Sequence, residues 1–338
     1  MQAVRFHQHG GPEVLRYEVT PDPAPQAGLA IVRVRACALN HLDLWERRGL
    51  ERVTLPLPHI SGSDVAGEIV GAEGFAVGTR VMLHPGLSCG RCAACVAGRD
   101  NLCASYDVLG YRSDGGYAEL VKVPLANVIP IPPHVDFVSA AAFPLTFLTA
   151  WHMLVTLAKV RPGDQVLVIA AGSGVGQAAV QIARFLGARV LATAGSDEKR
   201  SRAEALGAEA VINHSTEEIS ASVRRLTAGR GVDVVVEHVG QATWEQSVRS
   251  LARGGRVVTC GATTGFAATL DLRHLFARQI SLLGSYMGTK GELLEAAELF
   301  FSGRLRPAID RTFPLRDAAE AQRRMERREH FGKIVLET

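Results

Sequence analysis

The chain has 338 residues, which exceeds the size at which one hydrophobic core keeps growing, so two domains are expected. Its composition, 47% hydrophobic and 21% charged, is that of a soluble globular protein. The 37 basic and 34 acidic side chains leave a net charge of +3 with no basic block, which argues against nucleic-acid binding. Because the first residues, MQAVRFHQHGG, contain no apolar run, we expect no secretory signal and a cytoplasmic protein.

The first 135 residues contain short apolar runs separated by proline and glycine. These runs fall at residues 31–36, 68–71, 79–83 and 117–123, and their length and composition are typical of β-strands. The sequence therefore predicts a β-rich domain at the start of the chain.

Four cysteines follow one another within residues 88–104, at Cys89, Cys92, Cys95 and Cys103. In a reducing compartment, clustered cysteines bind metal more readily than they form disulfides. Four thiolates at this spacing suit one tetrahedral zinc ion. The sequence predicts one zinc ion per chain at this lobe.

Residues 137–158 carry no charge and are long enough to span a bilayer. Pro144, His152 and several threonines interrupt this segment. A buried helix, a break and a second helix is the better interpretation, so no membrane contact is expected.

From Gly163 onward, apolar strands alternate with amphipathic helices. Such alternation predicts a parallel sheet covered by helices on both faces, the doubly wound α/β class. The predicted strands are 165–170, 189–194, 210–212, 232–236, 256–260 and 280–283, and the predicted helices are 175–186, 198–206, 217–226 and 243–252.

A glycine-rich turn, AAGSGVG, joins the first of these strands to its helix. Glycine permits close backbone approach, and the N-terminus of the following helix offers free N–H groups to a pyrophosphate. The spacing is G-x-G-x-G and differs from the G-x-G-x-x-G fingerprint. The prediction of dinucleotide binding therefore rests on the position of the turn between a strand and a helix. The candidate residues are Gly172, Ser173, Gly174, Val175 and Gly176.

The end of the second strand decides which nicotinamide cofactor is preferred, because an acid there would accept hydrogen bonds from a ribose 2′-OH. Asp197 and Glu198 lie at about the right distance, but both also suit the first turn of the next helix. Ser196, Lys199 and Arg200 could instead hold a 2′-phosphate. We therefore favour NADP(H) over NAD(H).

Further motifs run along the whole chain: GGPEVL at 10–15, ALNHLD at 38–43, PLTFLTAW at 144–151 and FGKIVL at 331–336. Together with the cysteine lobe and AAGSGVG, they resemble the medium-chain dehydrogenase/reductase proteins, which include zinc alcohol dehydrogenases and quinone oxidoreductases. The resemblance implies a GroES-like catalytic domain with an inserted Rossmann domain.

This resemblance sets the expected domains and further cofactor contacts. The catalytic domain would comprise residues 1–145 and 285–338, with the zinc lobe at 88–104, and the Rossmann domain residues 146–284. A homodimer or homotetramer is expected, paired through the strand at 280–283. The resemblance places Thr149, His214, Gly261, Ala262 and Lys333 near the cofactor.

In zinc alcohol dehydrogenases the four-cysteine lobe is structural, and a second zinc with three protein ligands performs catalysis. The resemblance aligns those three ligands with Asn40, Ser63 and Leu145, and the proton-relaying hydroxyl with Leu42. Amide, hydroxyl and alkyl groups make a poor zinc site. A shifted site recruiting His41, Asp43, His59 or Asp64 is the alternative.

Without a Lewis acid, hydride transfer favours acceptors that delocalise the resulting negative charge. We therefore predict an NADP(H)-dependent reductase of quinones or α,β-unsaturated carbonyls. Asn40 would donate an amide hydrogen bond, His41 or water would supply a proton, and Asp43 would orient its neighbours. The alternatives are a zinc alcohol dehydrogenase with substituted ligands and a non-catalytic nucleotide-binding protein.

Overall fold

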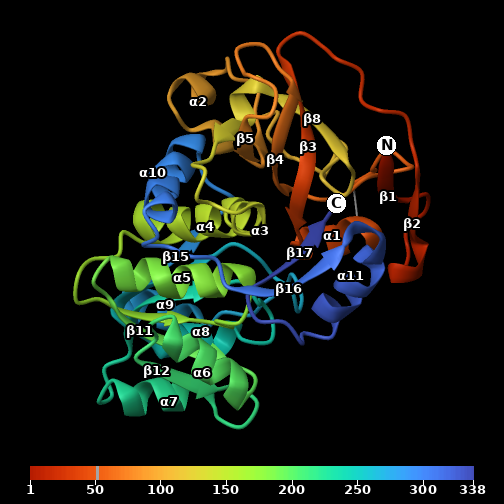
Figure 1. Cartoon of the computed structure of the whole chain (residues 1–338). Coiled ribbons are helices and arrows are strands. Elements are labelled where there is room, and N and C mark those ends of the chain that lie inside the picture. The colour runs from red at the N-terminus through yellow and green to blue at the C-terminus, as the bar shows by residue number, and fades with distance from the viewer. Residues whose placement is uncertain (51–52) are drawn as a thin grey trace. The chain divides into compact units, whose positions relative to one another are not determined.

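The computed structural model describes residues 1–50 and 53–338, which form two compact units. Unit 1 comprises Met1–Leu145 and Thr289–Thr338, and unit 2 comprises Thr146–Gly288 (Figure 1). Each unit is built around a sheet of its own. Within the described residues, the helices are all too short or too polar to cross a membrane.

The main sheet of unit 1 draws its strands from both ends of the chain. Its order is β16-β17-β3-β4-β5-β9, and β8 also pairs with β3. The antiparallel pairing of β17 with β3 brings the last residues of the chain beside the strand that leads into the ALNHLD motif. The strands are β3 (Leu29–Ala38), β4 (Asp64–Gly71), β5 (Arg80–Leu83), β8 (Leu120–Pro124), β9 (Val128–Pro130), β16 (Ile309–Pro314) and β17 (Lys333–Glu337).

Strand β3 shows why this sequence forms a half-buried sheet. Val32 and Val34 are fully buried, whereas Arg33 and Arg35 between and after them face outward. This alternation gives each strand one apolar face for the core. At its end β3 becomes buried on both faces, from Ala36 to Ala38, so the chain enters the interior before the first helix.

Smaller elements complete unit 1. Helix α11 contributes Ala318, Ala321 and Met325 to the same core as the sheet. Two small two-stranded sheets also belong to this unit. The elements are β1 (Gln2–Phe6), β2 (Leu15–Val19), β6 (Gly86–Leu87), β7 (Asp107–Val108), α1 (His41–Arg48), α2 (Ala93–Val96), α3 (Phe137–Ala142), α10 (Lys290–Phe301) and α11 (Ala318–Glu326).

Unit 2 has a six-stranded parallel sheet of order β12-β11-β10-β13-β14-β15. This is the Rossmann order, with the reversal between β10 and β13, and it confirms the predicted α/β class. The strands are β10 (Gln165–Val168), β11 (Arg189–Ala194), β12 (Ala210–Asn213), β13 (Val232–Glu237), β14 (Leu251–Thr259) and β15 (Ser281–Gly284). The helices are α5 (Gly174–Phe185), α6 (Asp197–Ala205), α7 (Ile219–Leu226), α8 (Trp244–Ser250) and α9 (Leu272–Arg278).

The uncharged segment 137–158 folds as a helix, a break and further helix, as predicted. Helix α3 ends at Ala142, and α4 (Pro144–Trp151) begins with proline, which is tolerated in the first turn of a helix. A π-helical segment then follows at His152–Leu157, which the sequence did not predict.

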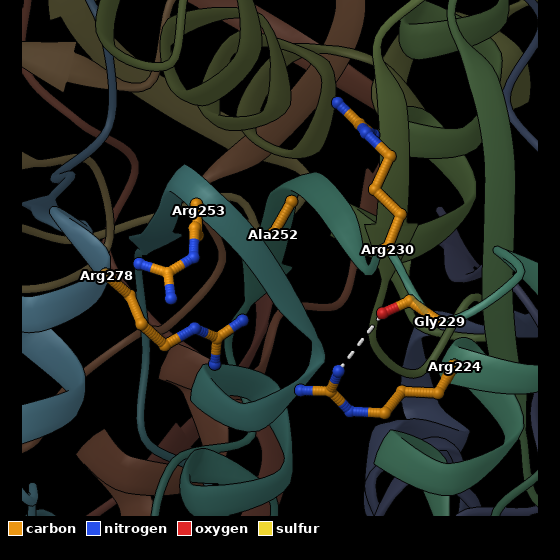
Figure 2. A pocket seen from close by; sticks show the side chains of 6 residues that line it. All are labelled: Arg224, Gly229, Arg230, Ala252, Arg253 and Arg278. Atoms are coloured by element: carbon orange, nitrogen blue, oxygen red, sulfur yellow. Dashed lines mark hydrogen bonds between the residues drawn. The ribbon is translucent and has the colours of Figure 1, made fainter.

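The sheet of unit 2 presents two chemically different edges. Its carboxyl edge carries the loops that follow each strand, where parallel sheets bind ligands. Near the amino end of β14 lies a hollow lined mainly by arginines from several segments, shown in Figure 2.

Candidate active site and cofactor-binding edge

Asn40 and Asp43 lie where β3 passes into helix α1 of unit 1. Asn40 occupies the cap position before the helix and is 6% exposed. Its backbone N–H donates to the Asp43 carboxylate at 2.8 Å. An acidic side chain in the first helical turn satisfies a free donor in this way and fixes the entry of the chain. The two residues predicted as catalytic neighbours are therefore brought together.

Asp43 is fully buried and receives a second hydrogen bond from the hydroxyl of Tyr117, also at 2.8 Å. Both donors bond the same oxygen, Oδ2. Burial raises the pKa of Asp43 to about 6, against hydrogen bonds from Asn40 and Tyr117 that favour its charged form. Tyr117 was not predicted as part of this cluster.

Replacing Asp43 with asparagine tests this buried carboxyl. The pKa is raised from 3.8 to about 6, so the folded state binds the proton more tightly than the unfolded state. The stability that this proton contributes is present below the unfolded pKa and is lost as pH rises through the folded pKa. The D43N variant should therefore gain stability relative to the native protein between about pH 4 and pH 7, by about 3 kcal/mol in urea unfolding.

The matched control is Asp317→Asn, because Asp317 is exposed and makes no side-chain capping bond. Its stability difference from the native protein should stay constant over the same pH range. A D43N difference that is equally constant would show that Asp43 does not titrate as its burial requires.

A buried ion pair completes the cluster. The Lys333 ammonium donates to Asp64 Oδ2 at 2.9 Å and to Asn40 Oδ1 at 2.6 Å. The Asn40 amide also donates to Asp64 Oδ2 at 2.9 Å, and the backbone N–H of Leu145 donates to Asp64 Oδ1 at 2.8 Å. The side chains of Lys333 and Asp64 are 2% and 0% exposed. A charged pair so deeply buried persists only because both partners are hydrogen-bonded.

The positions aligned with catalytic zinc ligands therefore hold a different chemistry. Asn40 bonds Lys333 and Asp64, Ser63 is fully buried, and Leu145 contributes only its backbone N–H. Burial raises the pKa of the nearby Cys37 thiol well above its usual value, so Cys37 is kept as a neutral thiol. A buried ammonium bonded to the amide and the carboxylate of this cluster makes it a poor receptor for a divalent cation.

The alternative shifted metal site does not assemble from the residues that were considered for it. His59 donates from Nε2 to the carbonyl of Gly110 at 2.8 Å, and Asp64 is committed to Lys333. Among residues 1–50 and 53–338, the one group of three or more metal-ligating side chains is the cysteine lobe. His41 packs edge-on against Trp45, with ring centroids 5.0 Å apart.

The four sulfurs of the lobe converge on one point. All four Sγ atoms lie within 4.8 Å of one another, with Cys89 to Cys95 at 3.9 Å and Cys92 to Cys95 at 3.5 Å. Zinc–sulfur bonds of 2.3 Å in a tetrahedron separate the sulfurs by about 3.8 Å. Backbone N–H groups of Arg91 and Cys92 lower the pKa of the Cys89 thiol to about 6. The residues present therefore fit a closed four-thiolate zinc site.

The carboxyl edge of unit 2 gathers the glycine-rich turn and the loop after β13. Ser173 caps helix α5, and its hydroxyl accepts from the backbone N–H of Gly176 at 2.8 Å. A Cβ on Gly176 would lie 2.2 Å from the carbonyl oxygen of Ala170, so only glycine fits this turn. The Ser173 hydroxyl lies 2.9 Å from His238 Nε2.

His238 was missed by sequence reasoning. It follows β13, is 8% exposed, and burial lowers its pKa, which keeps the ring neutral beside the turn. Glu237 before it is fully buried and accepts the backbone N–H groups of His238, Val239 and Gly240. The residues EHVG, directly after the predicted strand at 232–236, were the signal that could have identified His238.

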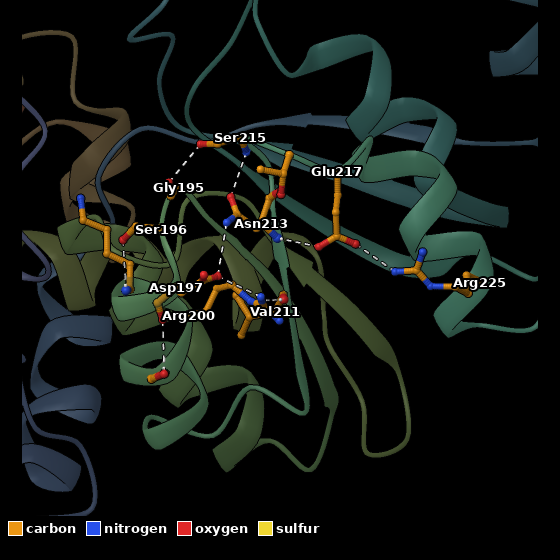
Figure 3. Close-up of polar contacts among 12 residues, drawn as sticks. Gly195, Ser196, Asp197, Arg200, Val211, Asn213, Ser215, Glu217 and Arg225 are labelled. Carbon is orange, nitrogen blue, oxygen red and sulfur yellow. Dashed lines mark hydrogen bonds and ion pairs between the residues drawn. The ribbon is translucent and has the colours of Figure 1, made fainter.

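The loops after β11 and β12 meet at the same edge (Figure 3). Ser196 caps helix α6 and accepts from the backbone N–H of Lys199 at 3.3 Å. Arg200 donates to the carbonyl of Val211 at 3.0 Å and pairs with Asp197 at 3.1 Å. Asp197 thus lies in the first turn of the helix, in agreement with the simpler role considered for it.

The remaining predicted cofactor residues lie in unit 2, apart from Lys333. His214 follows β12, and its backbone N–H donates to the carbonyl of Ala194 at 3.0 Å. Gly261 and Ala262 follow β14. Thr149 lies in α4 and is 4% exposed. Lys333 belongs to unit 1, where sequence reasoning missed its partnership with Asp64.

Comparisons with known proteins match both parts of the chain. Residues 26–133 match the alcohol dehydrogenase GroES-like domain, and residues 174–302 match the zinc-binding dehydrogenase family. A quinone oxidoreductase of Rattus norvegicus is 31% identical over 332 residues, covering 95% of this chain and 92% of the relative. An NAD-dependent alcohol dehydrogenase of Sulfolobus acidocaldarius is 31% identical over 349 residues, covering 99% of both.

A solved structure of an NAD-dependent alcohol dehydrogenase covers 100% of both chains at 48% identity, with a TM-score of 0.96. The relatives are oxidoreductases, which identifies the chain as an enzyme that acts on small molecules with a nicotinamide cofactor. The chain belongs to the medium-chain dehydrogenase/reductase superfamily, with a GroES-like domain and a Rossmann domain.

Proposed function

We propose that the protein is an NADP(H)-dependent reductase of quinones or α,β-unsaturated carbonyls, with one structural zinc and no catalytic zinc. The observation that carries this proposal is the buried contact of Lys333 with Asp64 and Asn40. Asn40 is one of the three positions that the resemblance aligns with catalytic zinc ligands, and here it bonds Lys333 and Asp64. The quinone oxidoreductase relatives support the same substrate class.

The chain's own residues then supply electrostatics and a proton. The nicotinamide, when bound, supplies the hydride. Lys333 holds a positive charge in the interior, where charge acts strongly, and favours negative charge on a nearby substrate oxygen. Asn40 uses one amide hydrogen on Asp64 and keeps a second for an acceptor. Asp43 fixes the backbone of Asn40, and His41 or water provides the proton.

Activity assays with a panel of quinones, enones and simple alcohols test this proposal directly. Purified protein should oxidise NADPH with quinones and enones and should turn over simple alcohols far more slowly. Zinc analysis on the same sample should give about one ion per chain, as four cysteine ligands require. Brisk alcohol oxidation with no activity on quinones or enones would overturn the assignment.

The NADP preference rests on the helix terminus of α6. Ser196, Lys199 and Arg200 would hold a 2′-phosphate there, and Gly172, Gly174, Val175 and Gly176 would receive the pyrophosphate. The Lys199→Gln variant should raise the KM for NADPH about tenfold and change the KM for NADH less than about twofold, because a charge-assisted bond to phosphate is lost.

Arg202→Gln on the same helix is the matched control and should leave both KM values unchanged. Steady-state kinetics with each cofactor supply the measurement. If Lys199→Gln raises the KM for NADH as much as the KM for NADPH, the 2′-phosphate is not held at this helix terminus.

A second candidate is an NAD-dependent alcohol dehydrogenase with substituted ligands, which the 48% identical structure favours. It requires a second metal ion per chain and activity that a chelator removes before the protein unfolds. Metal content per chain therefore separates the two candidates.

We further propose that β15 pairs between two copies to give a homodimer or part of a homotetramer. Strand β15 ends the sheet order in unit 2, and Ser281, Leu282 and Gly284 are exposed. An unpaired edge of this kind is a template for strand pairing across a two-fold axis. Light scattering on the purified protein gives the assembly mass.

A further inference from the structure

Three arginines of unit 2 converge on one hollow of about 450 Å³. Arg224 lies in α7, Arg253 near the start of β14, and Arg278 at the end of α9. Figure 2 shows their guanidinium groups turned toward one another, whereas Arg230 at the rim points away. Gly229 and Ala252 complete the lining. The size falls within the range of small-molecule sites.

These three guanidinium groups have backbone carbonyls as partners. Arg224 donates to the carbonyls of Gly229 and Arg249, both at 3.2 Å. Arg253 donates to the carbonyl of Ala277 at 3.0 Å, and Arg278 donates to that of Leu251. These bonds fix the planes of the groups but use only part of the five N–H donors that each carries.

No carboxylate lies within ion-pair distance of Arg224, Arg253 or Arg278 in the part of the chain that the structure describes. Their neighbours differ: Arg225 pairs with Glu217 at 2.9 Å, and Arg230 pairs with Asp233 at 2.5 Å. Burial lowers the pKa of Arg278, and the charges of Arg224 and Arg253 lower it further. Three like charges therefore share one hollow without a counter-charge, an arrangement that an anion would relieve.

The hollow is separate from the dinucleotide edge. Arg230 precedes β13, whose first residue is Val232, and Arg253 stands near the amino end of β14. Ser173 and His238 follow the carboxyl ends of β10 and β13. Since all strands of this sheet are parallel, the two groups lie at opposite edges.

We propose that this hollow, the arginine hollow, binds a multiply charged phosphate group of a small molecule at a site distinct from the cofactor site. The planar forks of several arginines match phosphate oxygens in pairs. Three uncompensated charges suit a diphosphate better than a singly charged carboxylate. If these arginines served only to donate hydrogen bonds to backbone carbonyls, their three guanidinium groups would not need to converge.

Inorganic pyrophosphate is the probe, measured by calorimetry on the full-length protein with NADPH and NADH both in excess to block the cofactor edge. The native protein should show one saturable site of micromolar affinity. The Arg253→Gln/Arg278→Gln variant should bind pyrophosphate at least about tenfold more weakly, because two charge-assisted bonds to phosphate are lost. The single variant Arg253→Gln, at an exposed position, should show a smaller loss in the same direction.

Arg225→Gln is the matched control, because it removes the same charge from the same helix at a residue paired with Glu217. It should bind pyrophosphate like the native protein, and all variants should keep the native KM for the cofactor. Absence of saturable binding to the native protein, or unchanged affinity in both arginine-hollow variants, would overturn the proposal.

Discussion

Replacing Lys333 with methionine is expected to destabilise unit 1 by about 3–5 kcal/mol, because the variant leaves the Asp64 carboxylate buried without its cation. Asp64 is fully buried, and it would keep only the donors from Asn40 and the backbone of Leu145. A methionine fills the space of the lysine stem, so the loss reports charge rather than packing. The urea midpoint of unfolding provides the measurement.

The double variant Asp64→Asn/Lys333→Met isolates the charge pair. Removing both charges should recover most of the lost stability, since an unpaired buried charge costs more than an absent pair. Lys122→Met is the matched control: its ammonium reaches the carbonyl of Ala24 only at 3.4 Å, so the change should stay within about 0.5 kcal/mol. A single variant as stable as the native protein would show that the pair is not charged.

The Lys333 variants should show different effects on stability and on activity. If Lys333 favours negative charge on the substrate oxygen, the double variant should fold well and still lose quinone-reductase activity, by about 100-fold in kcat. If the double variant regains both properties, Lys333 has only a structural role. This outcome would remove the main support for hydride transfer without a catalytic metal.

The Rossmann part of the fold was predictable because its signals are local. The predicted strand 189–194 coincides with β11 (Arg189–Ala194), and Ser196 caps the next helix as its residue type indicates. In unit 1, Pro144 gave the break between α3 and α4 by the same kind of local signal. Each of these features depends on residues a few positions apart, which a pattern of hydrophobic and turn residues records.

The cluster in unit 1 could be predicted only in part, because its contacts join distant segments. Lys333 and Asn40 are separated by 293 residues, and Lys333 and Asp64 by 269. Motifs identified Asn40 and Asp43, but only the pairing of β17 with β3 brings Lys333 beside them. The arginine hollow shows the same limit: the sequence contains no basic block, yet three separate segments place their charges together.

Replacing Cys103 with serine is expected to remove zinc from the protein and to unfold the lobe. Cys103 is the most buried of the four thiols, at 6% exposed, and a serine hydroxyl is not a zinc ligand of this type. Structural zinc sites contribute about 10–16 kcal/mol of binding energy in small peptides, so the lobe cannot keep its shape without the ion. Metal content per chain and hydrogen exchange across residues 89–103 measure both effects.

Cys260→Ser is the matched control. Cys260 lies in unit 2, and burial raises its thiol pKa to about 12, so it stays a neutral thiol and not a thiolate ligand. The variant should therefore keep the native zinc content. The same samples test whether the lobe metal takes part in catalysis. Because a closed four-thiolate site has no position for substrate, Cys103→Ser should retain its quinone-reductase rate at temperatures where unit 1 remains folded. One result would contradict the proposal that the lobe zinc is structural and that hydride transfer needs no metal. In that result the native protein holds two zinc ions, and a chelator removes its activity while residues 89–103 stay protected from hydrogen exchange.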